Sequence, residues 1–125
     1  MRYRLFIASC LLVFVAVGVG CGGWTRIEDY PCPNPDGTTK VTYKNFVKGF
    51  LDTWCNKCHA SSSKSRRGAP ITYIFDAYEI VLTVKQRIFI RSADKNTTMP
   101  PGPDDPPEAD RKKLAEWIVC GSPRE

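Results

Sequence analysis

The feature that most constrains this chain is a cluster of scarce residues within five positions, Cys55-Asn56-Lys57-Cys58-His59. His59 is the single histidine among 125 residues, and the chain holds only six cysteines. Thiol and imidazole groups are the side chains that most often bind metals or undergo covalent and redox chemistry. We therefore expect the chain to fold around whatever chemistry this cluster performs.

Two cysteines separated by two residues, with a histidine directly after the second, have the spacing of covalent haem attachment. Each thiol adds to one vinyl group of the haem, and the adjacent imidazole is thereby held under the iron. The spacing predicts that Cys55 and Cys58 attach one haem and that His59 is an axial ligand of its iron.

Three other uses of the cysteines deserve comparison. A thioredoxin-type redox pair would follow a β-strand, whereas this motif ends an aromatic-rich segment with helical periodicity. A structural zinc site would recruit Cys32 and Cys120, but these are not a short-spaced pair and would tend to oxidise in an exported protein. Disulfides that use all four cysteines would leave the histidine unexplained.

The first twenty residues have the layout of an export signal. Arg2 and Arg4 precede an apolar run over residues 5–19 that contains no acidic residue and ends in small residues. The run is shorter and richer in glycine than the roughly 20 apolar residues of a bilayer span. Residues 1–20 are therefore predicted to be a signal peptide, with an uncleaved membrane anchor as the alternative.

Cleavage after Gly20 would make Cys21 the first residue of the mature chain. This position resembles that of a bacterial lipoprotein, in which the cysteine after the cut carries lipid, although Gly18 stands where leucine is usual. Lipid on Cys21 would tether the protein to a membrane, and ordinary secretion is the alternative. Residues 21–40 are rich in Gly, Pro, Asn, Asp and Thr, which predicts a tether and loop.

The charge balance excludes one class of partner. Two of the 18 basic residues leave with the signal, so 16 basic residues face 13 acidic ones, a net charge of +3. This excess is too small to indicate nucleic-acid binding. The basic run Lys64-Ser65-Arg66-Arg67 would neutralise a haem propionate, steer an acidic partner, or simply be a solvated loop.

Hydrophobic periodicity predicts a first helix over residues 43–55. Thr42 can cap it, and Phe46, Phe50 and Trp54 recur at i, i+4 and i+8. Gly49 costs this helix about 1 kcal/mol, so we expect another backbone to pass close to it.

A second helix is predicted over residues 77–92, where Asp76 and Glu79 form a capping-box-like start. Ile80, Val81, Val84 and Ile88 would share one face, although the β-branched content leaves a strand as the alternative.

A third helix is predicted over residues 108–120, opened by Pro106 and Pro107, with Leu114, Trp117 and Ile118 facing inward. The preceding segment, residues 94–107, contains five prolines and cannot be regular structure. Met99 therefore lies in a stiff loop. These three helices and two long loops predict a single all-α domain over residues 41–123.

The motif and two later segments resemble the class I c-type cytochromes, and most nearly the small exported bacterial monohaem members. The later segments are Met99-Pro100-Pro101 and the stretch from Leu114 to Pro123, which reads LxxWxxCGxP. The resemblance spans about residues 42–123. It implies a cytochrome c-like fold, with three main helices and long loops wrapped around one covalently bound haem c.

Two positions depart from the family pattern. Ala60 stands where many relatives have glycine, and the usual Gly-Pro pair before an apolar residue is replaced by Gly68-Ala69-Pro70-Ile71. These departures leave the haem assignment intact but affect the path of the loop.

The resemblance also implies roles for individual residues. Met99 is expected to be the second axial ligand, since Met1 leaves with the signal and no other methionine remains. The carbonyl of Pro70 is expected to accept the ring N–H of His59, which would orient the ring. The remaining pair, Cys32 and Cys120, is expected to form a disulfide, with two free thiols as the alternative.

We therefore expect a periplasmic electron carrier that is not an enzyme, has one haem with His/Met ligation, and exchanges electrons with redox partner proteins. One alternative is a haem subunit of a larger oxidoreductase. Another is a haem-based sensor, which would require that Met99 does not bind the iron. A dihaem peroxidase acting alone is excluded, because the chain has one attachment motif.

Overall fold

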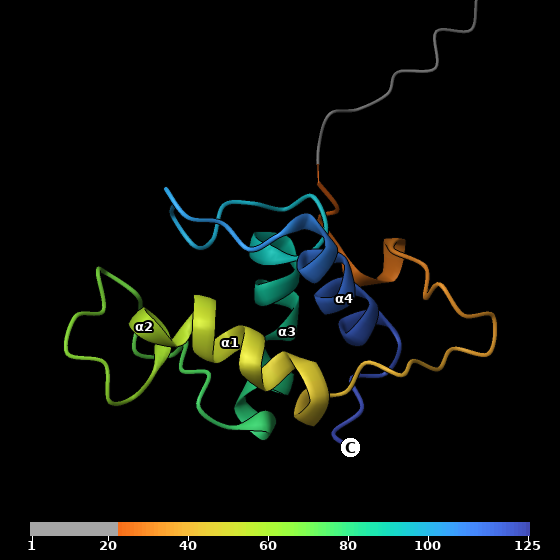
Figure 1. Ribbon diagram of the computed structural model, residues 1–125, viewed down its shortest axis with the longest axis horizontal. Coiled ribbons are helices and arrows are strands. Elements are labelled where there is room, and N and C mark those ends of the chain that lie inside the picture. Colours follow the sequence, from red (N-terminus) through yellow and green to blue (C-terminus); the bar gives the residue numbers. More distant parts are fainter. Residues whose placement is uncertain (1–22) are drawn as a thin grey trace, which may run out of the picture.

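A computed structural model describes residues 23–125 of the chain (Figure 1). Within this part the protein is helical without strands, which confirms the all-α class and excludes the strand alternative for residues 77–92. The predicted signal peptide and Cys21 lie outside the described residues. The elements in chain order are η1 (Ile27–Asp29), η2 (Tyr43–Val47), α1 (Lys48–Trp54), α2 (Asn56–His59), α3 (Tyr78–Ser92) and α4 (Glu108–Val119).

The π-helical turn η2 runs directly into α1, so residues 43–54 form one continuous helix (Figure 1). The Thr42 hydroxyl accepts a hydrogen bond from the Asn45 amide at 3.0 Å, and the Asn45 side-chain oxygen accepts one from the Thr42 amide at 2.8 Å. This reciprocal capping box satisfies amide groups that a helix start would otherwise leave unpaired. The predicted cap at Thr42 is confirmed.

The same helix start receives the end of the chain. The Tyr43 amide donates to the Pro123 carbonyl at 2.9 Å, and the Lys44 amide donates to the Arg124 carbonyl at 3.1 Å. The indole N–H of Trp117 donates to the Pro123 carbonyl as well, at 2.8 Å. The C-terminal residues therefore join α4 to the first helix.

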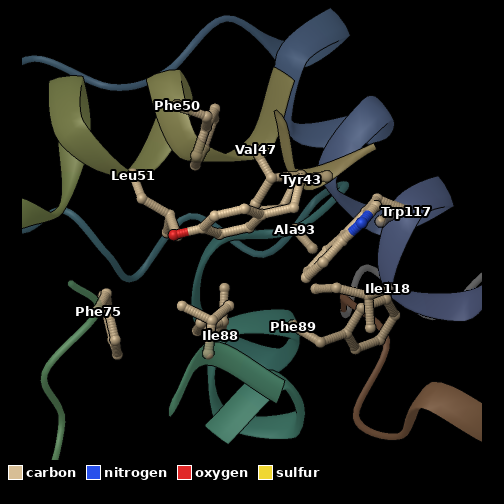
Figure 2. Packing of buried hydrophobic residues seen from close by; sticks show 13 residues of the cluster. Tyr43, Val47, Phe50, Leu51, Phe75, Ile88, Phe89, Ala93, Trp117 and Ile118 are labelled. Carbon is tan, nitrogen blue, oxygen red and sulfur yellow. The ribbon is translucent and has the colours of Figure 1, made fainter. Parts of the chain in front are cut away.

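Apolar side chains from the first helix, α3 and α4 point toward one another and form the core (Figure 2). On α4, Leu114, Trp117 and Ile118 are all at most 1% exposed, as predicted. On α3, Val81 and Ile88 are buried as predicted, but Ile80 is 39% exposed. The expectation for Ile80 is wrong because the buried face of α3 is centred on Val81, Ile88 and Phe89. Ile88 and Phe89 lie seven and eight positions after Val81, which is two helical turns.

Two further expectations are also wrong. Asp76 does not cap α3, whose N-cap is Ala77; the Asp76 carboxylate instead accepts a hydrogen bond from the Ser61 amide at 2.9 Å. Gly49 is exposed, and a Cβ added to it would meet no atom within 4 Å. The backbone that does approach the first helix reaches its start at Tyr43 rather than Gly49.

Residues 23–40 are mostly irregular, as expected of a loop, but they pack onto the domain. The Tyr30 ring meets the Phe89 ring edge-on, with centroids 5.6 Å apart. The Gln86 side chain accepts a hydrogen bond from the Ile27 amide at 3.3 Å and donates one to the Thr25 carbonyl at 3.1 Å. These contacts make the segment part of the folded unit.

Cys32 and Cys120 form a disulfide with an S–S distance of 2.00 Å. The predicted pair is thus present, and it joins the N-terminal segment to the end of α4. No helix within residues 23–125 has the length and apolar character needed to cross a bilayer.

Candidate functional site

A single cavity brings the predicted site residues together. Its walls come from four parts of the chain: the end of the first helix with α2, the loop over residues 66–75, α3, and the proline-rich loop over residues 99–101. Its empty space is about 930 Å³, counting the open mouth. Cys55, Cys58, His59, Pro70 and Met99 all line it.

The helical turn of α2 places the motif at the cavity. The amides of Cys58 and His59 both donate to the Cys55 carbonyl, each at 3.0 Å. One short turn therefore sets the relative positions of the two thiols and the imidazole. In Figure 1, α2 and the loop after it lie at one end of the molecule, and the loop after α3 reaches toward that same end.

The ring of His59 is held by a backbone carbonyl. Its Nδ1 atom lies 2.8 Å from the Tyr73 carbonyl oxygen. A carbonyl can only accept, so Nδ1 carries the proton and donates it, which leaves a lone pair on Nε2. The imidazole is therefore held in the tautomer that can bind a metal through Nε2.

The prediction that Pro70 accepts this hydrogen bond is wrong. The Pro70 carbonyl accepts from the Tyr73 amide at 3.0 Å and from Nη2 of Arg66 at 2.8 Å. A carbonyl oxygen has two lone pairs, and both are used here. Tyr73 takes the role three residues later, and no local pattern in the sequence distinguishes its carbonyl from that of Pro70.

Sequence reasoning also missed Phe75, which is 7% exposed. Its ring stacks on the His59 imidazole, with centroids 4.4 Å apart and planes at 11°. Its amide donates to the His59 carbonyl at 3.0 Å. The stacked ring and the Tyr73 hydrogen bond together restrict rotation of the imidazole.

Cys55 and Cys58 are both free thiols at the cavity wall. Burial raises the pKa of the Cys55 thiol to about 12, and the adjacent Cys58 thiol adds to the rise. Reactive dithiol sites lower the pKa of the attacking cysteine instead. The environment of Cys55 therefore does not favour the thioredoxin-type alternative.

The zinc alternative fails on geometry. It requires Cys32 and Cys120 as ligands, but these two sulfurs are bonded to each other. In the part of the chain that the structure describes, no group of three or more His, Cys, Asp and Glu side chains could hold a metal ion. The presence of free Cys55 and Cys58 likewise removes the alternative in which all four cysteines form disulfides.

Arginine side chains supply the charge of the cavity wall. They are Arg66 and Arg67 from the loop, and Arg87 and Arg91 from α3. None of these forms an ion pair with another residue between positions 23 and 125. Arginine suits the planar, two-pronged recognition of carboxylates and phosphates, so the wall favours an anionic ligand. The i, i+4 spacing of Arg87 and Arg91 was a signal in the sequence that both side chains would lie on one face of the helix.

Met99 reaches the cavity from the loop that follows α3. Its amide donates to the Arg91 carbonyl at 2.9 Å, and the Thr98 hydroxyl donates to the same carbonyl at 3.4 Å. Its side chain remains 39% exposed at the cavity wall. The fold thus brings this thioether to the same cavity as His59.

No family model, curated protein or solved structure matches this chain. The function of the cavity is therefore argued from its own residues.

Proposed function

We propose that this protein is an electron carrier that holds one covalently attached haem c in the cavity. The observation that carries the proposal is that Cys55, Cys58, His59 and Met99 line one cavity, although Met99 belongs to a separate segment of the chain. These are the two thiols and two axial ligands that the class I c-type cytochromes use.

The chemistry of the cavity fits this group in three respects. The thiols of Cys55 and Cys58 lie next to an imidazole whose Nε2 is free to bind iron. The arginines of the wall suit the two propionate carboxylates that a haem carries. Trp54, Phe75 and Ile88 provide apolar wall for the porphyrin face.

Haem iron, when bound, would supply one-electron chemistry between Fe(II) and Fe(III). The hydrogen bond from His59 Nδ1 to the Tyr73 carbonyl would make Nε2 a stronger electron donor. The Met99 thioether as second ligand would raise the reduction potential and leave no open position for oxygen. These two residues therefore favour electron transfer over catalysis.

The proposed setting is the periplasm, reached through the signal peptide over residues 1–20, with lipid on Cys21 as a possible tether. The proposed partners are redox proteins that donate and accept single electrons. This proposal combines the cavity with the export pattern of the sequence, because an oxidising compartment suits the disulfide between Cys32 and Cys120.

The test is the visible spectrum of the protein exported in cells with haem-maturation machinery. We expect a reduced c-type band and haem that stays with the polypeptide after denaturation. We also expect the weak far-red ferric band of an iron–thioether bond, lost in Met99→Ala and kept in the loop control Thr97→Ala. Wild-type protein without covalent haem would refute the proposal.

A second outcome would redirect the functional assignment. Covalent haem without the far-red band would show that Met99 is not a ligand. Rapid binding of carbon monoxide by the wild-type ferrous protein would then favour the haem-based sensor.

A further inference from the structure

We propose that Arg66 is a positioning residue for His59, acting through the loop over residues 60–70. This inference rests on the proposed function. The guanidinium of Arg66 joins the two ends of the loop and donates a hydrogen bond to the Pro70 carbonyl. The His59 ring then donates to the Tyr73 carbonyl instead.

The guanidinium makes three hydrogen bonds, all to backbone carbonyls of this loop. Nη1 donates to Ala60 at 3.0 Å, Nε donates to Ala69 at 3.1 Å, and Nη2 donates to Pro70 at 2.8 Å. Ala60 directly follows His59, whereas Ala69 and Pro70 lie at the far end of the loop. One rigid planar group therefore joins the two ends of the loop.

The Pro70 carbonyl connects this clamp to the histidine. It accepts from Arg66 at 2.8 Å and from the Tyr73 amide at 3.0 Å, which uses both of its lone pairs. The second of these bonds forms the turn that carries Tyr73, whose own carbonyl then accepts from His59 at 2.8 Å. Loss of the clamp would free a lone pair on Pro70 and release the turn that aims the Tyr73 carbonyl.

The neighbouring residue Arg67 provides a matched control. It lines the same cavity and carries the same charge. Its side chain is more exposed than that of Arg66, and its guanidinium makes no hydrogen bond within the described residues. Substitution of Arg67 removes one positive charge from the cavity wall without removing the clamp.

Charge and positioning act on the reduction potential with opposite signs. Removal of a positive charge near the iron favours the oxidised form and lowers the potential. A weaker hydrogen bond from His59 Nδ1 makes the imidazole a poorer electron donor, which disfavours the oxidised form and raises the potential. Arg66→Lys keeps the charge but cannot supply the three-point planar fork, so it isolates the positioning effect.

The experiment compares the haem-loaded wild type with Arg66→Lys, Arg66→Met and Arg67→Met. In the reduced, diamagnetic state, NMR measures solvent exchange of the His59 Nδ1 proton. We expect this exchange to be about tenfold faster in both Arg66 variants and unchanged in Arg67→Met. We also expect the potential to rise in Arg66→Lys and to fall in Arg67→Met.

If Arg66→Lys shows the proton exchange and the reduction potential of the wild type, the inference about Arg66 is overturned. The proposed function would still stand in that case, because the wild-type protein holds its haem. Wild-type protein without haem would instead refute the proposed function, and this inference with it. If the Arg66 variants fail to attach haem, a measurement on the wild-type protein still tests the Arg66 clamp. The Nε proton of Arg66 is expected to exchange more slowly than that of Arg67, and equal exchange would overturn the clamp.

Discussion

The imidazole of His59 lies against the phenyl ring of Phe75, with centroids 4.4 Å apart and ring planes at 11°. The Phe75 amide donates to the His59 carbonyl at 3.0 Å, and the Tyr73 carbonyl accepts from the imidazole at 2.8 Å. Residues 73–75 therefore hold both the ring and the backbone of the histidine. A buried aromatic ring at this point serves the site as well as the core.

Replacement of Phe75 by alanine should lower the free energy of unfolding by about 3 kcal/mol or more, because it removes a buried ring and leaves a cavity beside His59. Guanidinium unfolding of the haem-loaded protein measures this loss. Ile71→Ala is the control in the same loop: Ile71 is 70% exposed, and its variant should differ from wild type by less than about 0.5 kcal/mol. Equal effects of the two variants would contradict the burial of Phe75.

Replacement of Gly49 by alanine should raise the free energy of unfolding by about 1 kcal/mol. The residue lies in α1, and a Cβ there would meet no atom within 4 Å. Thermal unfolding measures the gain. Gly68→Ala is the opposite control, because Gly68 has a φ of +82° and alanine there should cost about 1 kcal/mol. Destabilisation by Gly49→Ala would instead support the close backbone approach that the sequence suggested.

Removal of the disulfide with Cys32→Ala and Cys120→Ala should lower the free energy of unfolding by about 4 to 5 kcal/mol in the chain-entropy model. The bond joins residues 88 positions apart, so it strongly restricts the unfolded chain. Urea unfolding with and without a reductant measures the effect. The reductant should weaken the wild type to the level of the double variant and leave that variant unchanged. A reductant with no effect on the wild type would argue against the bond.

Protein prepared without haem should show a slow reaction of the Cys55 thiol. Burial raises its pKa from 9.0 to about 12, which lowers the thiolate fraction about a thousandfold near neutral pH. Because the folded pKa exceeds the unfolded one, the thiol stabilises the haem-free fold fully below pH 9.0 and progressively less as the pH rises toward about 12.

Alkylation by iodoacetamide, followed by mass spectrometry at Cys55, measures this protection. The same protein in denaturant is the control, and it should react at the rate of an ordinary thiol. Equal rates in the folded and denatured protein would contradict the raised pKa of the Cys55 thiol.

Several features that depend on residues close in sequence were predictable, although the predicted cap at Asp76 and the inward placement of Ile80 were wrong. The capping box at Thr42 involves only Asn45, three residues away, and the inward face of α4 follows from the helical spacing of Leu114, Trp117 and Ile118. Such features rest on the 3.6-residue period and on hydrogen bonds within one turn. The expectation that another backbone passes close to Gly49 was wrong, because such an approach depends on a distant segment of the chain.

By itself, the sequence determined the order of the helices and the spacing of Cys55, Cys58 and His59. Each helix follows from a local hydrophobic period, and the three motif residues lie within five positions. Only the tertiary structure decided which carbonyl receives the His59 proton, and that Phe75 stacks on its ring. Only the tertiary structure also brought Met99 and the α3 arginines to the same cavity. These contacts join segments that meet through packing of the core and closure of loops, and no local period or cap encodes such a meeting.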